Sequence, residues 1–146
     1  MLIQEIADNL IIMKKNIIDN DIVLPIPNDF IKINVASIDN KEKFILDVNR
    51  KGTFKLTRCT YQERYQTSIP LIRLDVDTKP HRNPDNKVIL GTHIHIYKEG
   101  YGDKWAFPLD EIENNCFTDL KNLTQTFLDF CQYCNIENIP SVQEVI

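Results

Sequence analysis

Hydrophobic and polar positions change their period twice along the chain. From Leu2 to Ile17 the apolar residues recur every three to four positions, which predicts an amphipathic helix that ends near Asn20. Pro25 and Pro27 then favour an extended connection, because proline lacks a backbone donor and disfavours helix at the residue before it. Beyond them the chain reads as strands at residues 31–37, 43–49, 53–61, 69–77, 87–97 and a short stretch near 105–108.

Helical spacing returns after Pro108, in a set of apolar residues that runs from Phe117 to Cys134. It predicts a helix ending near Asn135, with Thr118 or Asn115 as N-cap, and a tail that adds a last helical turn. The order of helix, strands and helix predicts an α+β fold: an antiparallel five- or six-stranded meander sheet with the N-terminal and C-terminal helices packed on one face. A length of 146 residues fits a single domain over 1–146.

Two breaks are predicted inside the strand region. Arg50-Lys51-Gly52 is expected to form a tight hairpin, with Gly52 at positive φ, and residues 78–86 are expected to form a loop. That loop contains His81 and Arg82 and joins the two central strands, so we expect those strands to be antiparallel neighbours.

Alternation in the two central strands predicts one polar face. Residues two apart on a strand share a face, so Arg73 and Asp75 should lie together with His93, His95 and Tyr97. Imidazole titrates near neutral pH, so His93 and His95 are the candidate general base and acid. Arg73 would then stabilise charge on a phosphate, and Asp75 would orient one imidazole. The alternative is an ordinary solvated face, which is polar in any antiparallel sheet with one covered side.

The predicted substrate contacts surround this catalytic group. Lys55 on the neighbouring hairpin, or Arg82, would add a phosphate contact, and Tyr97 would orient the scissile group. His81 comes from the loop 78–86, which is also typical of a simple turn, and Glu99 comes from the glycine-containing loop after Tyr97.

A metal site is a further interpretation of the same residues. His93-x-His95-x-x-x-Glu99 has the spacing of the cupin metal motif, and Asp75 or His81 would supply another ligand. Cupins are glycine-punctuated barrels, however, whereas this chain has four glycines and two predicted helices. The sequence therefore favours a protein with no metal and no cofactor. Cys131-x-x-Cys134 lies inside the helical pattern and is read as a pair of buried thiols.

Composition narrows the class of protein. Apolar residues make up 42% and charged residues 26%, which is typical of a globular domain. A net charge of −4 disfavours a DNA-coating protein but leaves room for a local basic patch. The first residues lack a secretory pattern and no apolar run is long enough to span a bilayer, so we expect a cytoplasmic protein with reduced cysteines and no membrane partner.

The central motifs resemble a known group of sequences. Arg73-x-Asp75, His81-x-Asn83-Pro84-Asp85, the run from His93 to Gly100 and Trp105-Ala106 are similar to the signature of an uncharacterised family of short proteins from low-GC Gram-positive bacteria and their phages. That resemblance covers the middle of the chain and implies no function. In architecture alone, a helix followed by a meander is similar to small metal-independent ribonuclease toxins of the RelE and barnase type.

Two functions of different classes follow as hypotheses. The first is a small metal-independent, nuclease-like enzyme of the ribonuclease toxin type, with RNA or a nucleotide as substrate and an antitoxin as protein partner. The second is a non-enzymatic phage or accessory binder that recognises a nucleotide or inhibits a nucleic-acid-handling host protein, as in counter-defence, through the same face. An acidic domain suits the second role, because it can occupy a basic groove.

Overall fold

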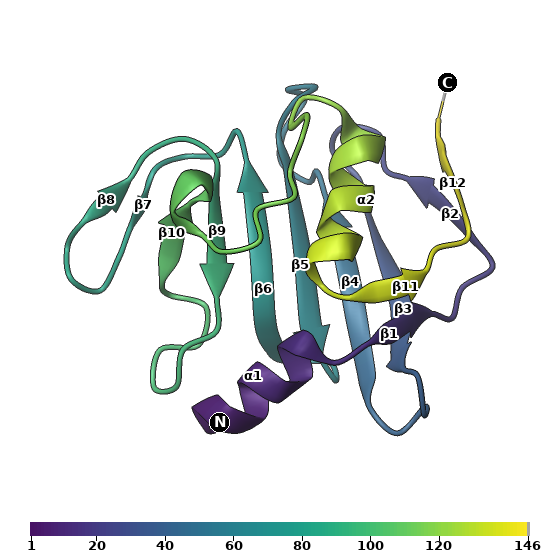
Figure 1. Ribbon diagram of the computed structural model, residues 1–146. Coiled ribbons are helices and arrows are strands. Elements are labelled where there is room, and N and C mark those ends of the chain that lie inside the picture. Colours follow the sequence, from purple (N-terminus) through teal and green to yellow (C-terminus); the bar gives the residue numbers. More distant parts are fainter. Residues whose placement is uncertain (146) are drawn as a thin grey trace.

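An eight-stranded sheet forms the centre of the computed structural model, which describes residues 1–145 (Figure 1). Neighbouring strands are antiparallel except for the last pair, β1 and β11, which is parallel. The spatial order is β10 (Ala106–Pro108), β9 (His93–Ile96), β6 (Ile69–Val76), β5 (Cys59–Tyr65), β4 (Lys43–Asn49), β3 (Phe30–Ser37), β1 (Lys15–Ile17) and β11 (Ile136–Asn138). The α+β class is confirmed, with more strands than predicted.

Two small sheets flank the large one. β2 (Asp21–Leu24) pairs in parallel with β12 (Ser141–Glu144), and β7 (His81–Arg82) pairs with β8 (Val88–Ile89) as a hairpin. This hairpin extends beyond the edge of the large sheet next to β9 and β10 (Figure 1). A short 3-10 helix, η1 (Leu109–Glu111), follows β10.

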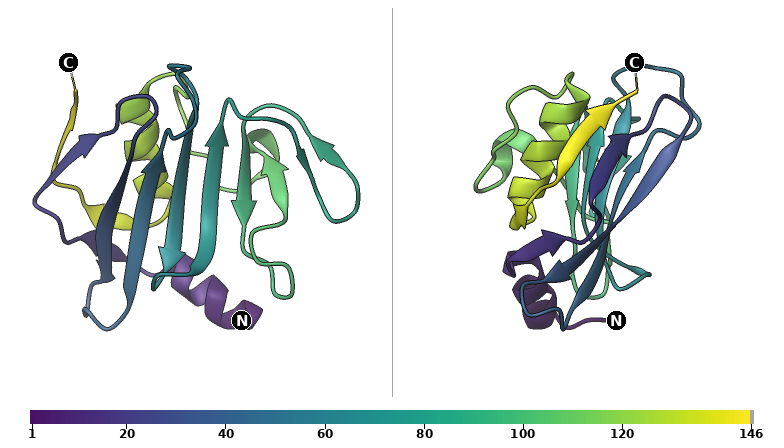
Figure 2. Two further views of the ribbon diagram at one scale, coloured as in Figure 1. Left: turned by 180° about the vertical axis from the view of Figure 1, so that it is seen from behind. Right: turned by 90° about the vertical axis from the view of Figure 1, so that its right-hand side faces the viewer.

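Both helices lie on the same side of the sheet, as the right-hand view of Figure 2 shows. α2 (Leu123–Tyr133) crosses the middle of the sheet, whereas α1 (Gln4–Ile12) lies across one end. Phe127 and Phe130 of α2 pack with Leu74 and Ile94 of the central strands in the buried core. The opposite side of the sheet therefore carries no helix among the described residues.

The predicted helical ends of the chain were wrong. α1 stops at Ile12 and Met13 is extended, after which the backbone of Lys15–Ile17 pairs with β3 and β11. Residues 136–138 and 141–144 form β11 and β12 and not a helical turn. Both segments pair with partners far away in the sequence, so tertiary pairing overrides their local helical pattern.

The predicted strand 53–61 and its tight hairpin were also wrong. β5 begins at Cys59, and the connection from β4 is a longer loop in which Gly52 does have a positive φ of 76°. Arg50 anchors this loop, because its buried guanidinium donates to the carbonyls of Pro25 at 2.8 Å and Leu56 at 2.9 Å. The predicted strand 87–97 is interrupted by Gly91, whose φ is 72°.

The N-cap of α2 also differs from the prediction. Asn122 caps the helix by accepting a hydrogen bond from the backbone of Gln125, in place of Thr118 or Asn115. Thr118 instead donates to Asp129 through its hydroxyl group. Asn115 donates its side-chain amide to the carbonyl of Leu109.

A buried ion pair ties β1 to β5. Lys15 Nζ lies 3.3 Å from Glu63 Oε2, and both side chains are fully buried. The same ammonium donates to the carbonyls of Ile11 at 3.1 Å and Cys134 at 3.0 Å. Burial raises the pKa of Glu63 to about 7, although the charge of Lys15 opposes the shift. Cys131 and Cys134 are buried, free thiols beside this pair.

Candidate functional site

The polar residues of β6 and β9 gather on the sheet side that has no helix. These strands are antiparallel neighbours, and their register places Arg73 opposite His95 and Asp75 opposite His93. Leu74, which lies between Arg73 and Asp75, points instead into the core. We use the term polar cluster for Arg73, Asp75, His93, His95 and Asp103, the last of which comes from the loop before β10.

Backbone carbonyls fix both imidazoles of the polar cluster. Nδ1 of His93 lies 2.8 Å from the carbonyl oxygen of Gly91, and Nδ1 of His95 lies 2.7 Å from that of Asp103. A carbonyl can only accept, so Nδ1 carries the proton in both rings. In the neutral form of each ring, Nε2 therefore has a free lone pair.

These two lone pairs converge on a single carboxylate oxygen. Oδ2 of Asp75 lies 3.3 Å from Nε2 of His93 and 3.2 Å from Nε2 of His95. Nε2 of His95 also lies 2.9 Å from Nη2 of Arg73, which can only donate. His95 therefore accepts from Arg73 and has no Nε2 proton for Asp75. Its lone pair faces a carboxylate oxygen, an arrangement that a cation between them would stabilise.

Arg73 is the cation that the polar cluster holds. Its Nε lies 3.0 Å from Asp75 Oδ1, and its Nη1 lies 2.9 Å from Asp103 Oδ2. Burial alone would raise the pKa of Asp75, but the neighbouring His93 and His95 side chains and the charge of Arg73 outweigh it and hold the pKa well below its usual value. Burial likewise opposes the charged form of His93, yet Asp75 and the Gly91 carbonyl raise the pKa of His93 above 6.5.

Exposure shows from which side the polar cluster can be reached. His93 and His95 are each only 1% exposed, whereas the side chains of Arg73 and Asp103 are 26% and 36% exposed. Asp75 lies between these extremes, with 11% of its side chain exposed. The cluster therefore opens on the side of Arg73 and Asp103.

His81 lies against the imidazoles of the polar cluster. Its ring centroid lies 4.6 Å from that of His95 and 5.8 Å from that of His93. Its Nε2 lies 2.7 Å from the carbonyl oxygen of Lys104, to which it donates. Asn83 fixes the same hairpin to β10, because its buried amide donates to the Ala106 carbonyl and accepts from the Ala106 amide.

Replacing Asn83 with alanine is expected to destabilise the protein by about 1–3 kcal/mol, since two buried backbone groups of Ala106 lose their partner. Chemical denaturation measures this change, and amide hydrogen exchange at Ala106 should become faster. Lys87→Ala, in an exposed residue of the same hairpin, is the control and should have little effect. Equal stability of the two variants would contradict the anchoring role of Asn83.

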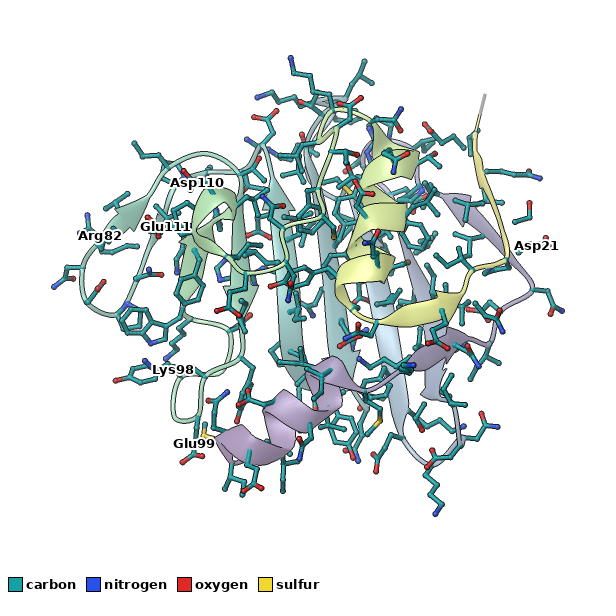
Figure 3. The ribbon with its side chains drawn as sticks, viewed as in Figure 1. Asp21, Arg82, Lys98, Glu99, Asp110 and Glu111 are labelled. Atoms are coloured by element: carbon teal, nitrogen blue, oxygen red, sulfur yellow. The ribbon has the colours of Figure 1, made fainter. Side chains whose placement is uncertain are left out.

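Four of the predicted substrate contacts lie elsewhere. Lys55 forms an exposed ion pair with Asp77, and Arg82 donates to the carbonyl of Asn86 on the outer hairpin (Figure 3). Tyr97 is buried in the core and donates to the carbonyl of Leu2, because the regular alternation of β9 ends at Ile96.

Glu99 lies beside α1 and away from the imidazoles. Its carboxylate accepts from the backbone amide of Gln4, at the start of α1 (Figure 3). The cupin-like spacing of His93, His95 and Glu99 therefore does not bring Glu99 into the cluster of candidate ligands.

Sequence reasoning missed Asp103 and the three backbone carbonyls that orient the imidazoles. Asp103 stands in a loop that was recognised by its glycines, Gly100 and Gly102, and an acidic residue in such a loop was the available signal. The sequence does not indicate that the backbone carbonyls of Gly91, Asp103 and Lys104 accept from the imidazoles, because every residue has such a carbonyl.

Three residues of the polar cluster have the geometry of metal ligands. One ligand atom from each of Asp75, His93 and His95 lies within 4.8 Å of the other two. Ligand atoms at about 2.0–2.1 Å from a tetrahedral ion are about 3.3 Å apart, close to both imidazole–carboxylate distances found here. Imidazoles that ligate metals commonly donate their other N–H to a carbonyl, as both rings do here.

Comparisons with known proteins place the chain in a family without assigning its chemistry. No curated protein and no solved structure matches it. One family model, described as a family of unknown function (DUF6978), matches residues 2–136 and so includes both helices and the whole polar cluster. Among the described residues, neither helix is long and apolar enough to cross a membrane. The match covers most of the chain, and the protein therefore belongs to this family of unknown function.

Proposed function

We propose that this protein is a metal-dependent enzyme that holds one divalent transition-metal ion between Asp75, His93 and His95. The observation that carries the proposal is the convergence of two imidazole Nε2 atoms on Oδ2 of Asp75, at 3.3 and 3.2 Å. Two imidazoles and one carboxylate suit ions such as Zn²⁺, Co²⁺ or Fe²⁺. An ion in this position supplies a Lewis acid, and hydrolysis is the reaction class that we assign.

Burial favours a metal ion over direct acid–base catalysis by the histidines. A general acid or base must come within hydrogen-bond reach of the substrate. His93 and His95 are each 1% exposed, so a polymer lying on the surface does not reach their Nε2 atoms. A small ion can occupy the space between the ligands and carry the chemistry toward the open side.

The number of protein ligands favours a catalytic site. Structural zinc sites are closed by four protein ligands, whereas catalytic sites keep three and leave one position for water or substrate. The cluster here offers three among the described residues, and its open side lies toward the partly exposed Arg73 and Asp103. His81 covers the imidazoles from the hairpin side.

Metal titration tests the proposal. The protein is stripped with EDTA, dialysed and titrated with Zn²⁺ by calorimetry and with Co²⁺ by visible absorption. We expect one ion per chain, and we expect His93→Ala and Asp75→Asn each to weaken binding by about a hundredfold or more, because each variant removes one of three ligands.

Glu99→Gln is the matched control for the metal titration. Glu99 completes the cupin-like spacing in the sequence, but its carboxylate contacts α1. This variant should therefore bind the ion like the wild type. Loss of metal binding in Glu99→Gln, or unchanged metal binding in His93→Ala, would show that the proposed set of ligands is wrong. Absence of binding to the wild type would overturn the proposal.

The two functions expected from the sequence stay predictions, and an incubation with total RNA separates them. Cleavage in excess EDTA supports a metal-independent nuclease, whereas cleavage that EDTA abolishes and Zn²⁺ restores supports the metal-dependent enzyme. Intact RNA, together with a protein partner retained in a pull-down, supports the non-enzymatic binder. The bacterial or phage origin, the cytoplasmic location and the antitoxin or host-protein partner also remain predictions.

A further inference from the structure

We propose that Arg73 competes with the metal ion for the polar cluster and, once displaced, binds the oxyanion of a phosphate-bearing substrate. The inference rests on the proposed metal site and adds the substrate class and the order of binding. Arg73 is therefore read as an internal cation that exchanges with the ion.

The contacts of Arg73 overlap the proposed metal ligands. Its Nη2 lies 2.9 Å from Nε2 of His95 and 3.3 Å from Oδ2 of Asp75, and its Nε lies 3.0 Å from Oδ1 of Asp75. The Nε2 lone pair of His95 cannot serve the guanidinium and an ion at the same time. Metal binding at this position therefore requires Arg73 to leave His95 and to give up its contact with Oδ2 of Asp75.

Electrostatic repulsion by the bound ion favours an outward movement of Arg73. A guanidinium and a divalent ion repel each other strongly at the distance of neighbouring ligands, and screening is weak in a cluster that is largely buried. The outward route is available, because 26% of the Arg73 side chain is exposed and its partner Asp103 is 36% exposed. The strand register places Arg73 beside Gln62 of β5, on the sheet side without helices.

Binding of a divalent ion reverses the net charge of the cluster, with Arg73 still counted as a member. With neutral imidazoles, Arg73 is outnumbered by the carboxylates of Asp75 and Asp103, so the cluster has an excess of one negative charge. A divalent ion changes this to an excess of one positive charge. Only the loaded cluster attracts an anion, and the ion should therefore bind before the substrate.

The displaced guanidinium is suited to an oxyanion. Its planar set of donors matches phosphate in a bidentate geometry, and such charge-assisted hydrogen bonds are strong. The open side of the proposed metal site faces Arg73, so one phosphate group can contact both the ion and the guanidinium. The structure thus assigns Arg73 to anchoring a phosphate ester next to the ion.

Metal titration of Arg73 variants tests the competition. Arg73→Gln should bind Zn²⁺ and Co²⁺ about tenfold more tightly than the wild type, since the competing cation is gone. Arg73→Lys keeps the charge but loses the planar set of donors, so its metal affinity should lie between those of the wild type and Arg73→Gln. Thermal unfolding of each metal-free variant verifies that it is folded.

Arg64→Gln is the matched control for Arg73→Gln. Arg64 is also a strand arginine paired with a carboxylate, but its partner is Asp47, so its loss should leave metal affinity unchanged. If both variants gain metal affinity equally, the gain comes from the loss of a positive charge at long range. That outcome would overturn the proposed competition between Arg73 and the ion. Unchanged or weaker affinity in Arg73→Gln, while the wild type binds the ion, overturns this inference and leaves the proposed function intact. No binding by any variant overturns the proposed function itself.

Inorganic phosphate tests the second step. Phosphate should tighten Co²⁺ binding to the wild type several-fold, and by thermodynamic linkage Co²⁺ should tighten phosphate binding by the same factor. The coupling should be lost in Arg73→Gln and kept in Arg64→Gln. Coupling that persists without Arg73 would show that phosphate contacts the ion alone and would overturn the anchoring role.

Discussion

Replacing Lys15 with methionine is expected to lower the free energy of unfolding by about 3–5 kcal/mol near neutral pH, the cost of breaking a buried ion pair from one side. The substitution leaves Glu63 buried without its partner. It also removes the donor that serves the carbonyls of Ile11 and Cys134. Such a loss is a large part of the roughly 5–15 kcal/mol that stabilises a domain. Urea denaturation followed by circular dichroism measures it.

Lys14→Met supplies the control for Lys15→Met. Lys14 is the adjacent residue and forms an exposed pair with Glu137, in which the side chains are 74% and 52% exposed, so its loss should change stability little. The double variant Lys15→Met/Glu63→Met should recover most of the loss, because an apolar pair replaces both charges. Equal effects of Lys14→Met and Lys15→Met would show that burial does not govern the pair.

Raising the pH from about 5 to about 8 is expected to cost the wild type about 2 kcal/mol more stability than Glu63→Gln. The folded-state pKa of Glu63 is raised from 4.5 to about 7 by burial, so the folded protein binds a proton that the unfolded chain releases. This stabilisation is fully present below pH 4.5 and is lost as the pH rises through about 7. Denaturation at a series of pH values measures the difference.

The surroundings of Glu63 leave it as the titrating group of this interior site. Lys15 is its ion-pair partner, and burial raises the pKa of the Cys131 thiol and that of the Cys134 thiol well above the usual value. Glu63→Gln resembles the protonated side chain and should match the wild type near the acid end of the range. A wild type whose stability follows that of Glu63→Gln at every pH would contradict the raised pKa.

Local patterns were sufficient to predict the parts of the fold whose pairing partners are close in sequence. The strands at 31–37 and 43–49 are found at almost those bounds as β3 and β4, because their alternation is regular and their turn is short. The gathering of Arg73, Asp75, His93 and His95 also followed from alternation and from one connecting loop. In a strand, residues two positions apart lie on the same face of the sheet, so the sequence alone predicts which side chains share a face.

Other features depended on contacts that local patterns do not contain. Lys15 falls within the predicted N-terminal helix, but it lies in a strand, and its ammonium enters the interior to meet Glu63. The tail after Asn135 pairs with the beginning of the chain, and no local period distinguishes that strand from a helical turn. The chemistry of the polar cluster depends on carbonyl groups and on the reach of Arg73, and neither is visible in residue types.

The pairing of the two ends also determines when the sheet can be completed. β1 and β2 are synthesised before their parallel partners, β11 and β12, and most of the other strands lie between them along the chain. A nascent chain thus carries the outer edge of β1 open, with unpaired backbone groups, until β11 has been synthesised. Closing so long a loop is slow as well as entropically costly. The large sheet is therefore completed only after β11 has been synthesised, and the outer edge of β1 is exposed until then.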